Sequence, residues 1–340
     1  MSSNESTHLG GTASNVEIYK IGLGLMMMTW TPNPTPDEQA FETIKTAIDL
    51  VPADKKLFIN SGEFYGVSPR TANLHLISRF FTKYPELADR TFLSVKGGTE
   101  AESLTPNGSP ENIRRSVDAV LAALDGKKKL DLFQCARVDE KVGIESMMKS
   151  LKGLVEEGKF NHIGVSEVSA ATLRKANAIH KVTAVEIEVS PWAYEDETKK
   201  VITTAKELGV TVIAYSPLGR GFLTGKLNPK DLPDGDFRKS LDKFQDEAAK
   251  HNQKIVDALT AIAEKKNSTS AQLSLAWVAS LGNNVVPIPG SSKASRVKEN
   301  LGAAKLVLTD GDLKEITAAL EENTVQGGRY NAAMGHALWA

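Results

Sequence analysis

The sequence contains only one cysteine, Cys135, among its 340 residues. A single cysteine excludes an internal disulfide bond and a cysteine zinc cluster. The chain also lacks a long uncharged apolar run, so no transmembrane helix is expected. Residues 1–8 are polar and lack the apolar core of a signal peptide. These absences favour a reducing, cytoplasmic setting, with entry into the nucleus by diffusion left open.

An excess of charge of either sign is also missing, because 41 Lys and Arg residues are balanced by 42 Asp and Glu residues. With a formal net charge of −1, no global field attracts nucleic acid or an anionic membrane. The six histidines are scattered, so no metal site is indicated. Apolar residues make up 41% of the chain, which is ordinary for a globular protein with a sizeable core. We therefore expect a small-molecule partner rather than nucleic acid or a membrane. The sequence does not determine the oligomeric state, for which a monomer is the expectation.

The chain does contain a regular alternation of strand-like apolar runs and segments with helical apolar spacing. Strands are predicted at residues 57–59, 92–95, 130–135, 160–165, 184–189, 210–215 and 285–288, after a glycine-punctuated region at 16–28 that holds a hairpin and a first strand. Helices are predicted at residues 37–50, 68–81, 109–124, 143–156, 170–179, 195–208, 252–265, 270–281, 293–304 and 310–321.

This alternation implies parallel strand pairing. About eight strand–helix units over this length predict an α/β fold, a closed (β/α)₈ TIM barrel with an extra C-terminal helix. We expect residues 1–340 to form a single domain, with a flexible N-terminus over residues 1–15. A doubly wound open sheet is the alternative, but it would carry Gly-x-Gly-x-x-Gly after its first strand. Here Gly22 and Gly24 are followed by Met27 at the position of the third glycine.

In a barrel of this kind, chemistry takes place at the carboxyl ends of the strands. Residues 60–66, Asn-Ser-Gly-Glu-Phe-Tyr-Gly, follow one predicted strand, and Lys96 ends the next. The phenol of Tyr65 is a poor acid near neutrality, with an ordinary pKa of about 10, and a nearby ammonium would lower that pKa. The two residues are a candidate proton-transfer pair. Taken singly, Tyr65 could equally be a packing residue and Lys96 a solvated strand end.

The end of the last predicted strand has the composition of an anion site. Residues 289–293, Pro-Gly-Ser-Ser-Lys, lead into a predicted helix, whose free N–H groups and dipole attract phosphate. A simple capped turn between strand and helix is the other interpretation. Tyr215, at another strand end, could offer its ring face to a flat heterocycle or belong to the core. The irregular stretch at residues 219–249 is typical of a functional loop.

Five motifs in order along the chain resemble those of the aldo-keto reductases, over about residues 18–304. They are residues 58–66 (Phe-Ile-Asn-Ser-Gly-Glu-Phe-Tyr-Gly), 131–137 (Asp-Leu-Phe-Gln-Cys-Ala-Arg), 163–166 (Ile-Gly-Val-Ser), 214–225 (Ala-Tyr-Ser-Pro-Leu-Gly-Arg-Gly-Phe-Leu-Thr-Gly) and 288–293 (Ile-Pro-Gly-Ser-Ser-Lys). The resemblance implies a (β/α)₈ barrel that binds NADPH without a Rossmann fold. It also implies hydride transfer between the nicotinamide and a carbonyl group.

The catalytic group of that family is a tetrad of Asp, Tyr, Lys and His. The resemblance implies that Tyr65 and Lys96 are catalytic, while Asn60 stands at the aspartate position and Ala136 at the histidine position. Asn60 can still hydrogen-bond Lys96, but it brings no negative charge, so Lys96 is expected to be less favoured as a cation. Ala136 opens space beside the reacting carbon, and Trp30 is assigned with it to the substrate pocket.

These departures resemble the yeast-type pyridoxal reductases, which share the Ala-Arg-Val-Asp sequence found at residues 136–139. The predicted reaction is therefore NADPH-dependent reduction of pyridoxal to pyridoxine. Pyridoxal carries a phenol beside its carbonyl group, and that phenol could replace the hydrogen bond of the missing histidine. A broad aryl-aldehyde reductase and a non-catalytic NADPH-binding regulatory relative remain as alternatives.

The resemblance also implies a set of cofactor-binding residues. They are Ser166 and Glu186 near the carboxamide, Tyr215 on the nicotinamide ring, Ser216, Leu218 and Arg220 along the pyrophosphate, Ser291, Lys293 and Arg296 at the adenosine 2′-phosphate, and Asn300 at the adenine. Glu167 and Glu186 stand where the family often has Asn and Gln, and a glutamate offers no amide donor. Residues 219–249 are expected to fold over the dinucleotide.

Overall fold

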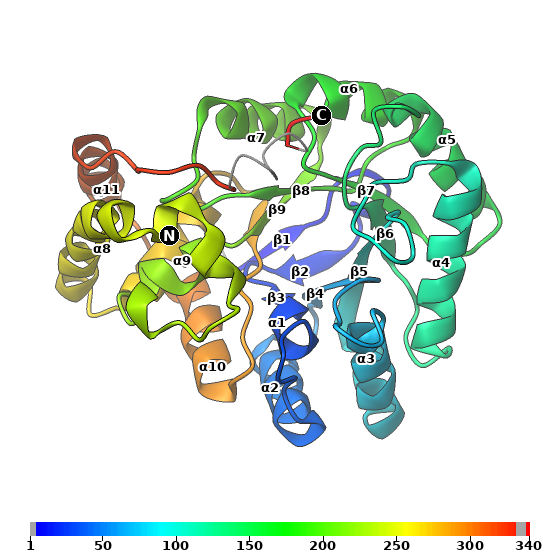
Figure 1. Ribbon diagram of the computed structural model, residues 1–340, viewed down its shortest axis with the longest axis horizontal. Coiled ribbons are helices and arrows are strands. Elements are labelled where there is room, and N and C mark those ends of the chain that lie inside the picture. The colour runs from blue at the N-terminus through cyan, green and yellow to red at the C-terminus, as the bar shows by residue number, and fades with distance from the viewer. Residues whose placement is uncertain (1–4, 331–337) are drawn as a thin grey trace.

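The computed structural model describes residues 5–330 and 338–340, and a parallel sheet lies at its centre (Figure 1). The strands of this sheet are β3 (Leu23–Gly24), β4 (Leu57–Gly62), β5 (Thr91–Gly97), β6 (Leu132–Cys135), β7 (His162–Ser166), β8 (Ala184–Glu188), β9 (Thr211–Tyr215) and β10 (Val285–Pro287). They pair in the order β10-β9-β8-β7-β6-β5-β4-β3. A parallel bridge between Gly24 and Gly290 joins the two ends of that order. The sheet is therefore closed, and the predicted (β/α)₈ barrel is confirmed.

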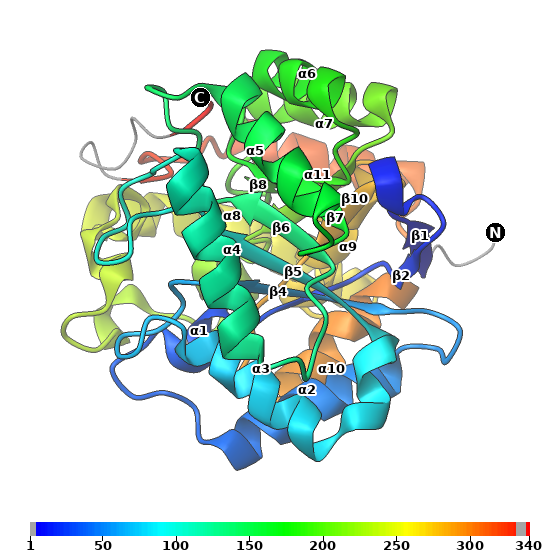
Figure 2. The same ribbon diagram turned by 90° about the vertical axis from the view of Figure 1, so that its right-hand side faces the viewer.

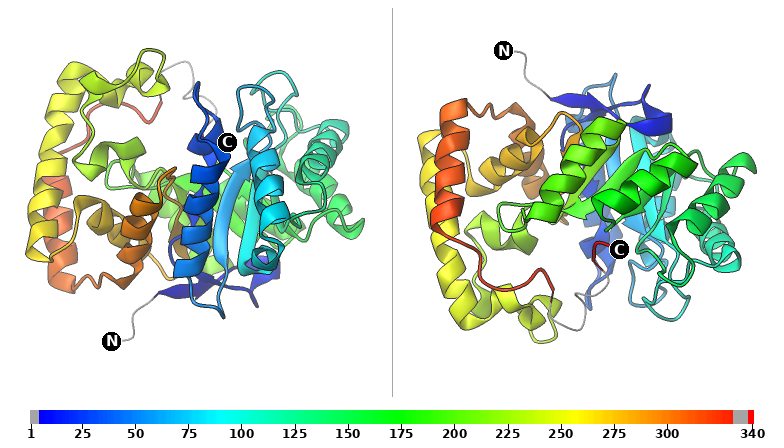
Figure 3. Two further views of the ribbon diagram at one scale, coloured as in Figure 1. Left: turned by 90° about the horizontal axis from the view of Figure 1, so that it is seen from below. Right: turned by 90° about the horizontal axis from the view of Figure 1, so that it is seen from above.

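Helices surround the barrel (Figure 1). They are α1 (Met26–Thr29), α2 (Asp37–Leu50), α3 (Ala72–Lys83), α4 (Pro110–Leu124), α5 (Ile144–Glu156), α6 (Ala170–Ile179), α7 (Asp196–Leu208), α8 (Asp246–Lys265), α9 (Ser270–Ser280), α10 (Ala294–Gly302) and α11 (Asp310–Glu322). The extra C-terminal helix, α11, lies beside α8 (Figure 3). Within the described ranges, no helix combines the length and the apolar character needed to cross a membrane.

The local sequence explains where the helices begin and which face they bury. In α2 the buried residues include Phe41, Ile44 and Ile48, which share one helical face turned toward the barrel. Helix α4 begins at Pro110, and the Ser109 hydroxyl accepts a hydrogen bond from the backbone N–H of Asn112. The predicted bounds of α2 are confirmed.

Two helices begin more than one residue away from the predicted position. Helix α3 starts at Ala72 rather than residue 68, because Pro69 lies in a turn whose carbonyl accepts from the Ala72 N–H at 3.0 Å. Helix α8 starts at Asp246 rather than residue 252. The apolar pattern did not predict this earlier start, because the first turn is acidic and shows little apolar spacing. Between β9 and α8 the predicted irregular loop holds four short 3₁₀ turns: η3 (Gly219–Thr224), η4 (Pro229–Asp231), η5 (Phe237–Ser240) and η6 (Asp242–Phe244).

An N-terminal hairpin covers the end of the barrel where the strands begin. Its strands β1 (Ser6–His8) and β2 (Glu17–Tyr19) are antiparallel and flank a 3₁₀ turn, η1 (Gly11–Ala13). Gly11 has a φ of +54°, and a Cβ there would lie 2.2 Å from the Val182 carbonyl oxygen, so only glycine fits. Leu9 and Ala13 are buried against the barrel, so residues 5–15 are ordered in the structure, which differs from the flexible N-terminus predicted for residues 1–15. Residues 1–4 lie outside the described residues.

After α11, residues 323–330 lie at the opposite end of the barrel, where the strands end (Figure 2). Asn252 of α8 holds this segment by exchanging two hydrogen bonds of 2.9 Å with the backbone of Gln326. Farther along, the Trp339 N–H donates to the Glu167 carbonyl at 3.0 Å. We call residues 323–330 and 338–340 the tail. Its path places polar side chains over the predicted site.

Candidate active site

The turn after β4 holds Tyr65 over the end of its own strand. A Cβ on Gly62 would lie 2.9 Å from the Tyr65 ring, so glycine lets the ring fold back onto the strand end. The hydroxyl of Thr29 in α1 donates to the Tyr65 carbonyl at 2.6 Å. The Tyr65 side chain is buried, with 6% of the residue exposed. Its ring is therefore fixed by the backbone rather than free to swing in solvent.

Asn73 of α3 anchors this turn, a role that the sequence analysis missed. Its Nδ2 donates to the Leu25 carbonyl at 2.9 Å and to the Thr29 hydroxyl at 2.7 Å. Its Oδ1 accepts from the Ser61 hydroxyl at 2.6 Å. A fully buried amide with all these bonds made stabilises one arrangement of α1, β4 and α3.

Four polar side chains from different strands meet inside the barrel beneath Tyr65. The Lys96 ammonium of β5 donates to Asn60 Oδ1 at 2.7 Å and to Glu186 Oε1 at 2.6 Å. Asn60 Nδ2 and Gln134 Nε2 both donate to Glu186 Oε2, at 2.7 and 2.6 Å. Lys96 Nζ also lies 5.2 Å from the centroid of the Tyr65 ring. The structure thus brings together the predicted catalytic residues Tyr65, Lys96 and Asn60, with Glu186 beside them.

The electrostatics of this group differ from the sequence-based expectation for Lys96. Burial acts to lower the pKa of Lys96, but the Glu186 carboxylate and Tyr65 outweigh it, and the pKa lies above its ordinary value. The expectation that Lys96 is less favoured as a cation was wrong, because a carboxylate from β8 contacts it. Burial raises the pKa of Tyr65, and the Lys96 cation opposes that rise without cancelling it. Tyr65 is therefore a protonated phenol near neutrality.

Trp30 and Ala136 lie against the Tyr65 ring, where the substrate pocket is predicted. The Trp30 and Tyr65 rings stack with centroids 5.6 Å apart and planes 25° apart. Phe64 meets both rings edge-on. Ala136 and Phe64 are buried with Tyr65 in one small apolar cluster, against which Trp30 packs. The structure places both predicted pocket residues beside the phenol; their contact with a substrate stays a prediction.

The predicted phosphate-binding residues surround the N-terminus of α10. Ser291 is buried, and its hydroxyl accepts from the Lys293 N–H at 3.1 Å. Lys293 precedes the first turn and Arg296 lies in it; both are exposed, and among the described residues no side chain caps that helix. Asn300 lies buried one turn farther along. Two exposed cations beside helix N–H groups are a donor set that fits a phosphate group.

The remaining predicted cofactor residues lie at the ends of β7 and β9 and in the loop that follows. Ser166 is buried at the end of β7, while Tyr215, Ser216, Leu218 and Arg220 are partly buried. Ser216 and Arg220 have φ angles of 48° and 55°, in the left-handed region. The structure therefore gathers these residues along one side of the barrel mouth. Their contacts with a dinucleotide stay predictions.

Arg329 of the tail reaches into this side of the barrel mouth. Its guanidinium donates to Glu167 at 2.8 Å, to Glu188 at 3.2 Å and to the Tyr215 hydroxyl at 3.2 Å. Arg220 donates to the Arg329 carbonyl at 3.0 Å and to Glu188 at 3.2 Å. The tail therefore balances two buried glutamates. The sequence analysis missed Arg329. The only available signal was that buried glutamates at predicted strand ends require a cation as a partner.

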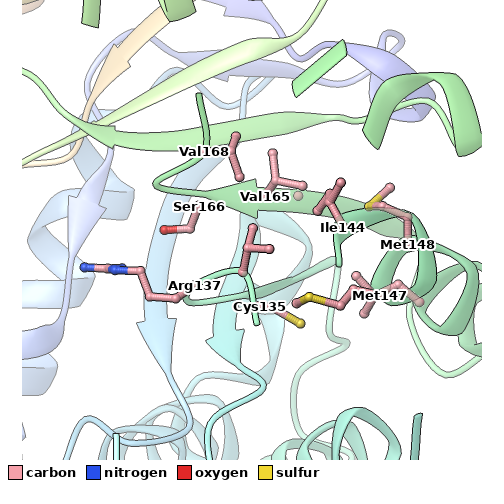
Figure 4. A pocket seen from close by; sticks show the side chains of 11 residues that line it. Cys135, Arg137, Ile144, Met147, Met148, Val165, Ser166 and Val168 are labelled. Carbon is pink, nitrogen blue, oxygen red and sulfur yellow. The ribbon is translucent and has the colours of Figure 1, made fainter. Parts of the chain in front are cut away.

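The pocket in Figure 4 lies between β6, β7 and α5, to one side of this group. Its lining is mostly apolar and includes Cys135, Met147 and Met148. Arg137 and Ser166 point their polar ends away from those sulfur atoms (Figure 4). Tyr65 and Lys96 do not line it, so this pocket is not where the proton chemistry lies. Within residues 5–330 and 338–340, no group of His, Cys, Asp or Glu side chains is arranged to hold a metal ion.

Comparison with known proteins agrees with the geometry. The model of the Aldo/keto reductase family matches residues 20–321. "Probable pyridoxal reductase 2" of Schizosaccharomyces pombe is 40% identical over 328 residues, which cover 95% of this chain and 97% of that protein. "Putative pyridoxal reductase" of Saccharomyces cerevisiae is 37% identical over 345 residues, covering 94% and 98%.

A solved structure, a glycerol dehydrogenase from Gluconobacter oxydans, superposes with a TM-score of 0.81. It covers 96% of this chain and 98% of its own, and at 22% identity it supports the fold alone. The family match and the two relatives extend over the barrel that carries Tyr65 and Lys96. The chain therefore belongs to the aldo/keto reductase family, a family of oxidoreductases that use a nicotinamide dinucleotide.

Proposed function

We propose that this protein reduces an aldehyde to a primary alcohol with NADPH, and that its substrate is pyridoxal, which becomes pyridoxine. The observation that carries the proposal is Tyr65, a buried phenol held beside the Lys96 ammonium at the carboxyl ends of the strands. When bound, NADPH supplies the hydride that adds to the carbonyl carbon. Tyr65 gives its proton to the carbonyl oxygen, so the aldehyde gains one hydride and one proton.

Lys96 makes this proton transfer easier by stabilising the phenolate that Tyr65 becomes. Its ammonium is held in the charged form by Glu186, and it lies 5.2 Å from the Tyr65 ring centroid. A positioned general acid of this kind contributes about two to four powers of ten to a rate. Trp30 and Phe64 pack on the phenol and limit the access of water to it.

The preference for NADPH is supported by the residues at α10. Lys293 and Arg296 are exposed cations beside an uncapped helix N-terminus. Arg and Lys side chains pair with a phosphate through charge-assisted hydrogen bonds. We assign them to the 2′-phosphate that distinguishes NADPH from NADH.

Pyridoxal as the substrate is supported by Ala136 and by the relatives. The side chain of Ala136 has no hydrogen-bond donor, and its backbone N–H is taken by the Gly97 carbonyl, so a substrate with its own donor beside the carbonyl is favoured there. Pyridoxal carries such a phenol. Two relatives with 40% and 37% identity are named as pyridoxal reductases.

The test is an assay of purified protein with NADPH and a panel of aldehydes that includes pyridoxal, benzaldehyde and a small aliphatic aldehyde. Consumption of reduced nicotinamide is followed by absorbance, and pyridoxine is identified as the product. We expect the highest kcat/KM for pyridoxal. Equal values across aromatic aldehydes would indicate a broad aryl-aldehyde reductase instead. Binding of NADPH without turnover of any aldehyde would contradict the proposal and favour a regulatory protein.

A further inference from the structure

The negative charge that supports Lys96 does not come from position 60, where the sequence has an asparagine. We infer that Glu186 supplies it in place of a carboxylate at position 60, and that the neutral amide of Asn60 bridges Lys96 and Glu186. This inference rests on the proposed function, because it names a positioning residue for that reaction. Glu186 acts on the substrate only through Lys96 and Tyr65.

The contact between Glu186 and Lys96 spans the inside of the barrel. The two residues lie on β8 and β5, and their charged atoms are 2.6 Å apart. Their side chains are 3% and 7% exposed. A buried ammonium without a partner carries a large desolvation cost, and a carboxylate at hydrogen-bond distance offsets that cost. Glu186 is thus what allows Lys96 to stay charged at this depth.

Asn60 is the side chain that fits beside such a carboxylate. Its carbonyl oxygen accepts from Lys96 while its amide donates to Glu186, at 2.7 Å in each case. An aspartate here would place a second carboxylate at the same distance, and two carboxylates so close resist ionising together. An amide at position 60 and an acid at position 186 therefore belong together.

The surroundings of Glu186 leave it little freedom for another role. Its Oε1 accepts from Lys96, and its Oε2 accepts from Asn60 and Gln134. All three donors belong to this chain. The predicted contact of Glu186 with the nicotinamide carboxamide is thus less consistent with the structure than a role in holding Lys96.

The pH dependence of the reaction is the property that this arrangement controls. The working state has Tyr65 protonated, Lys96 charged and Glu186 ionised. Tyr330 of the tail is the other titratable group whose charge acts on Tyr65. Without the carboxylate, the first proton leaves the Tyr65–Lys96 pair at a lower pH, whichever of the two loses it. An opposite charge at this distance is worth about one to three units of pKa.

Four proteins test the inference: wild type, Glu186→Gln, the double variant Asn60→Asp with Glu186→Gln, and Asp131→Asn. The double variant moves the negative charge from position 186 to position 60 and keeps the net charge of the wild type. Gln134 can turn its amide to accept from a glutamine at 186, because its Oε1 is buried without a partner in the described part of the chain. Asp131→Asn is the matched control, since it breaks the Lys128–Asp131 pair before β6, at the other end of the barrel.

The alkaline limb of kcat against pH is measured for NADPH and pyridoxal. We expect Glu186→Gln to move this limb to lower pH by about one unit or more, the double variant to restore it, and Asp131→Asn to leave it in place. An unmoved limb in Glu186→Gln would overturn the inference, and so would a double variant no better than the single one. If Glu186→Gln fails to fold and the double variant folds, that rescue supports the relocated charge.

Thermal unfolding against pH provides a readout that needs no turnover. In the wild type the pKa of Lys96 is raised, so its contribution to stability is fully present below the unfolded value of about 10.4 and is lost as pH rises from there through the higher pKa of the folded state. In Glu186→Gln the carboxylate is gone and only Tyr65 still opposes the effect of burial, so we expect the pKa of Lys96 to fall below that value.

The Tm deficit of Glu186→Gln relative to wild type should then be largest near about pH 7 and shrink toward about pH 10. The double variant should show a much smaller deficit across that range. A deficit in Glu186→Gln that does not change with pH would overturn the inference. A wild type that reduces no aldehyde would contradict the proposed function. The melting curves would still decide which residue supplies the negative charge beside Lys96.

Discussion

Arg329 donates a hydrogen bond of 2.8 Å to Glu167, although 162 residues separate them in the sequence. The two side chains are 4% and 0% exposed. The same guanidinium also contacts Glu188. One tail residue therefore compensates two buried carboxylates at the ends of β7 and β8. This contact fixes the tail against the barrel.

Replacing Arg329 with methionine should destabilise the protein strongly. The variant keeps a long side chain but leaves Glu167 and Glu188 with less compensation, and loss of one partner from a buried pair costs about 3–5 kcal/mol. The measurement is urea unfolding at neutral pH. Arg79→Met is the control, since its pair with Asp37 is exposed, and such pairs contribute about 0–1 kcal/mol. Similar losses in both variants would show that Arg329 has no special role.

Replacing Tyr65 with phenylalanine should lower kcat by about two to four powers of ten, the usual scale of general acid catalysis. The ring contacts with Trp30 and Phe64 are retained, and the Thr29 hydroxyl still binds the backbone at position 65. NADPH affinity, measured by fluorescence titration, should stay almost unchanged. A variant with near-normal turnover would show that another group donates the proton.

Replacing both Lys293 and Arg296 with alanine should weaken NADPH binding far more than NADH binding. Both cations are exposed at the start of α10, so their removal takes charge from the 2′-phosphate without disturbing the core. Dissociation constants for both cofactors are compared at low and high salt, and the difference should narrow as salt rises. Lys298→Ala, an exposed cation farther along α10, is the control. Equal losses for the two cofactors would contradict the assignment.

Replacing Ala136 with histidine should reduce the preference for pyridoxal. Ala136 is buried in the cluster of Phe64 and Tyr65, so an imidazole there fills space next to the phenol. Benzaldehyde, which lacks an internal donor, should suffer less or gain. The ratio of kcat/KM for pyridoxal over benzaldehyde should change by about tenfold or more, because it reports differential binding in the transition state. An unchanged ratio would show that position 136 does not shape the substrate site.

The sequence was sufficient for the barrel and for the main candidates at its mouth. Apolar spacing is a local property, so the strands and helices could be predicted from residues close together in the chain. Parallel strands bring their carboxyl ends to one face. The sequence alone therefore predicts that Tyr65 and Lys96 lie together, and the structure does bring them together. Boundaries were missed where a turn or an acidic first turn hid the pattern, as at Ala72 and Asp246.

Only the tertiary structure decided which charges meet. Lys96 and Glu186 are 90 residues apart, on strands that are not neighbours in the sheet, and they touch because side chains of several strands converge inside a closed barrel. Arg329 reaches Glu167 in the same way, from a tail that no periodic pattern predicts. The sequence determined that the charges exist and which strands carry Lys96 and Glu186. The pairing depends on distances across the barrel, since the energy of a buried charge is set by what lies within a few ångströms of it.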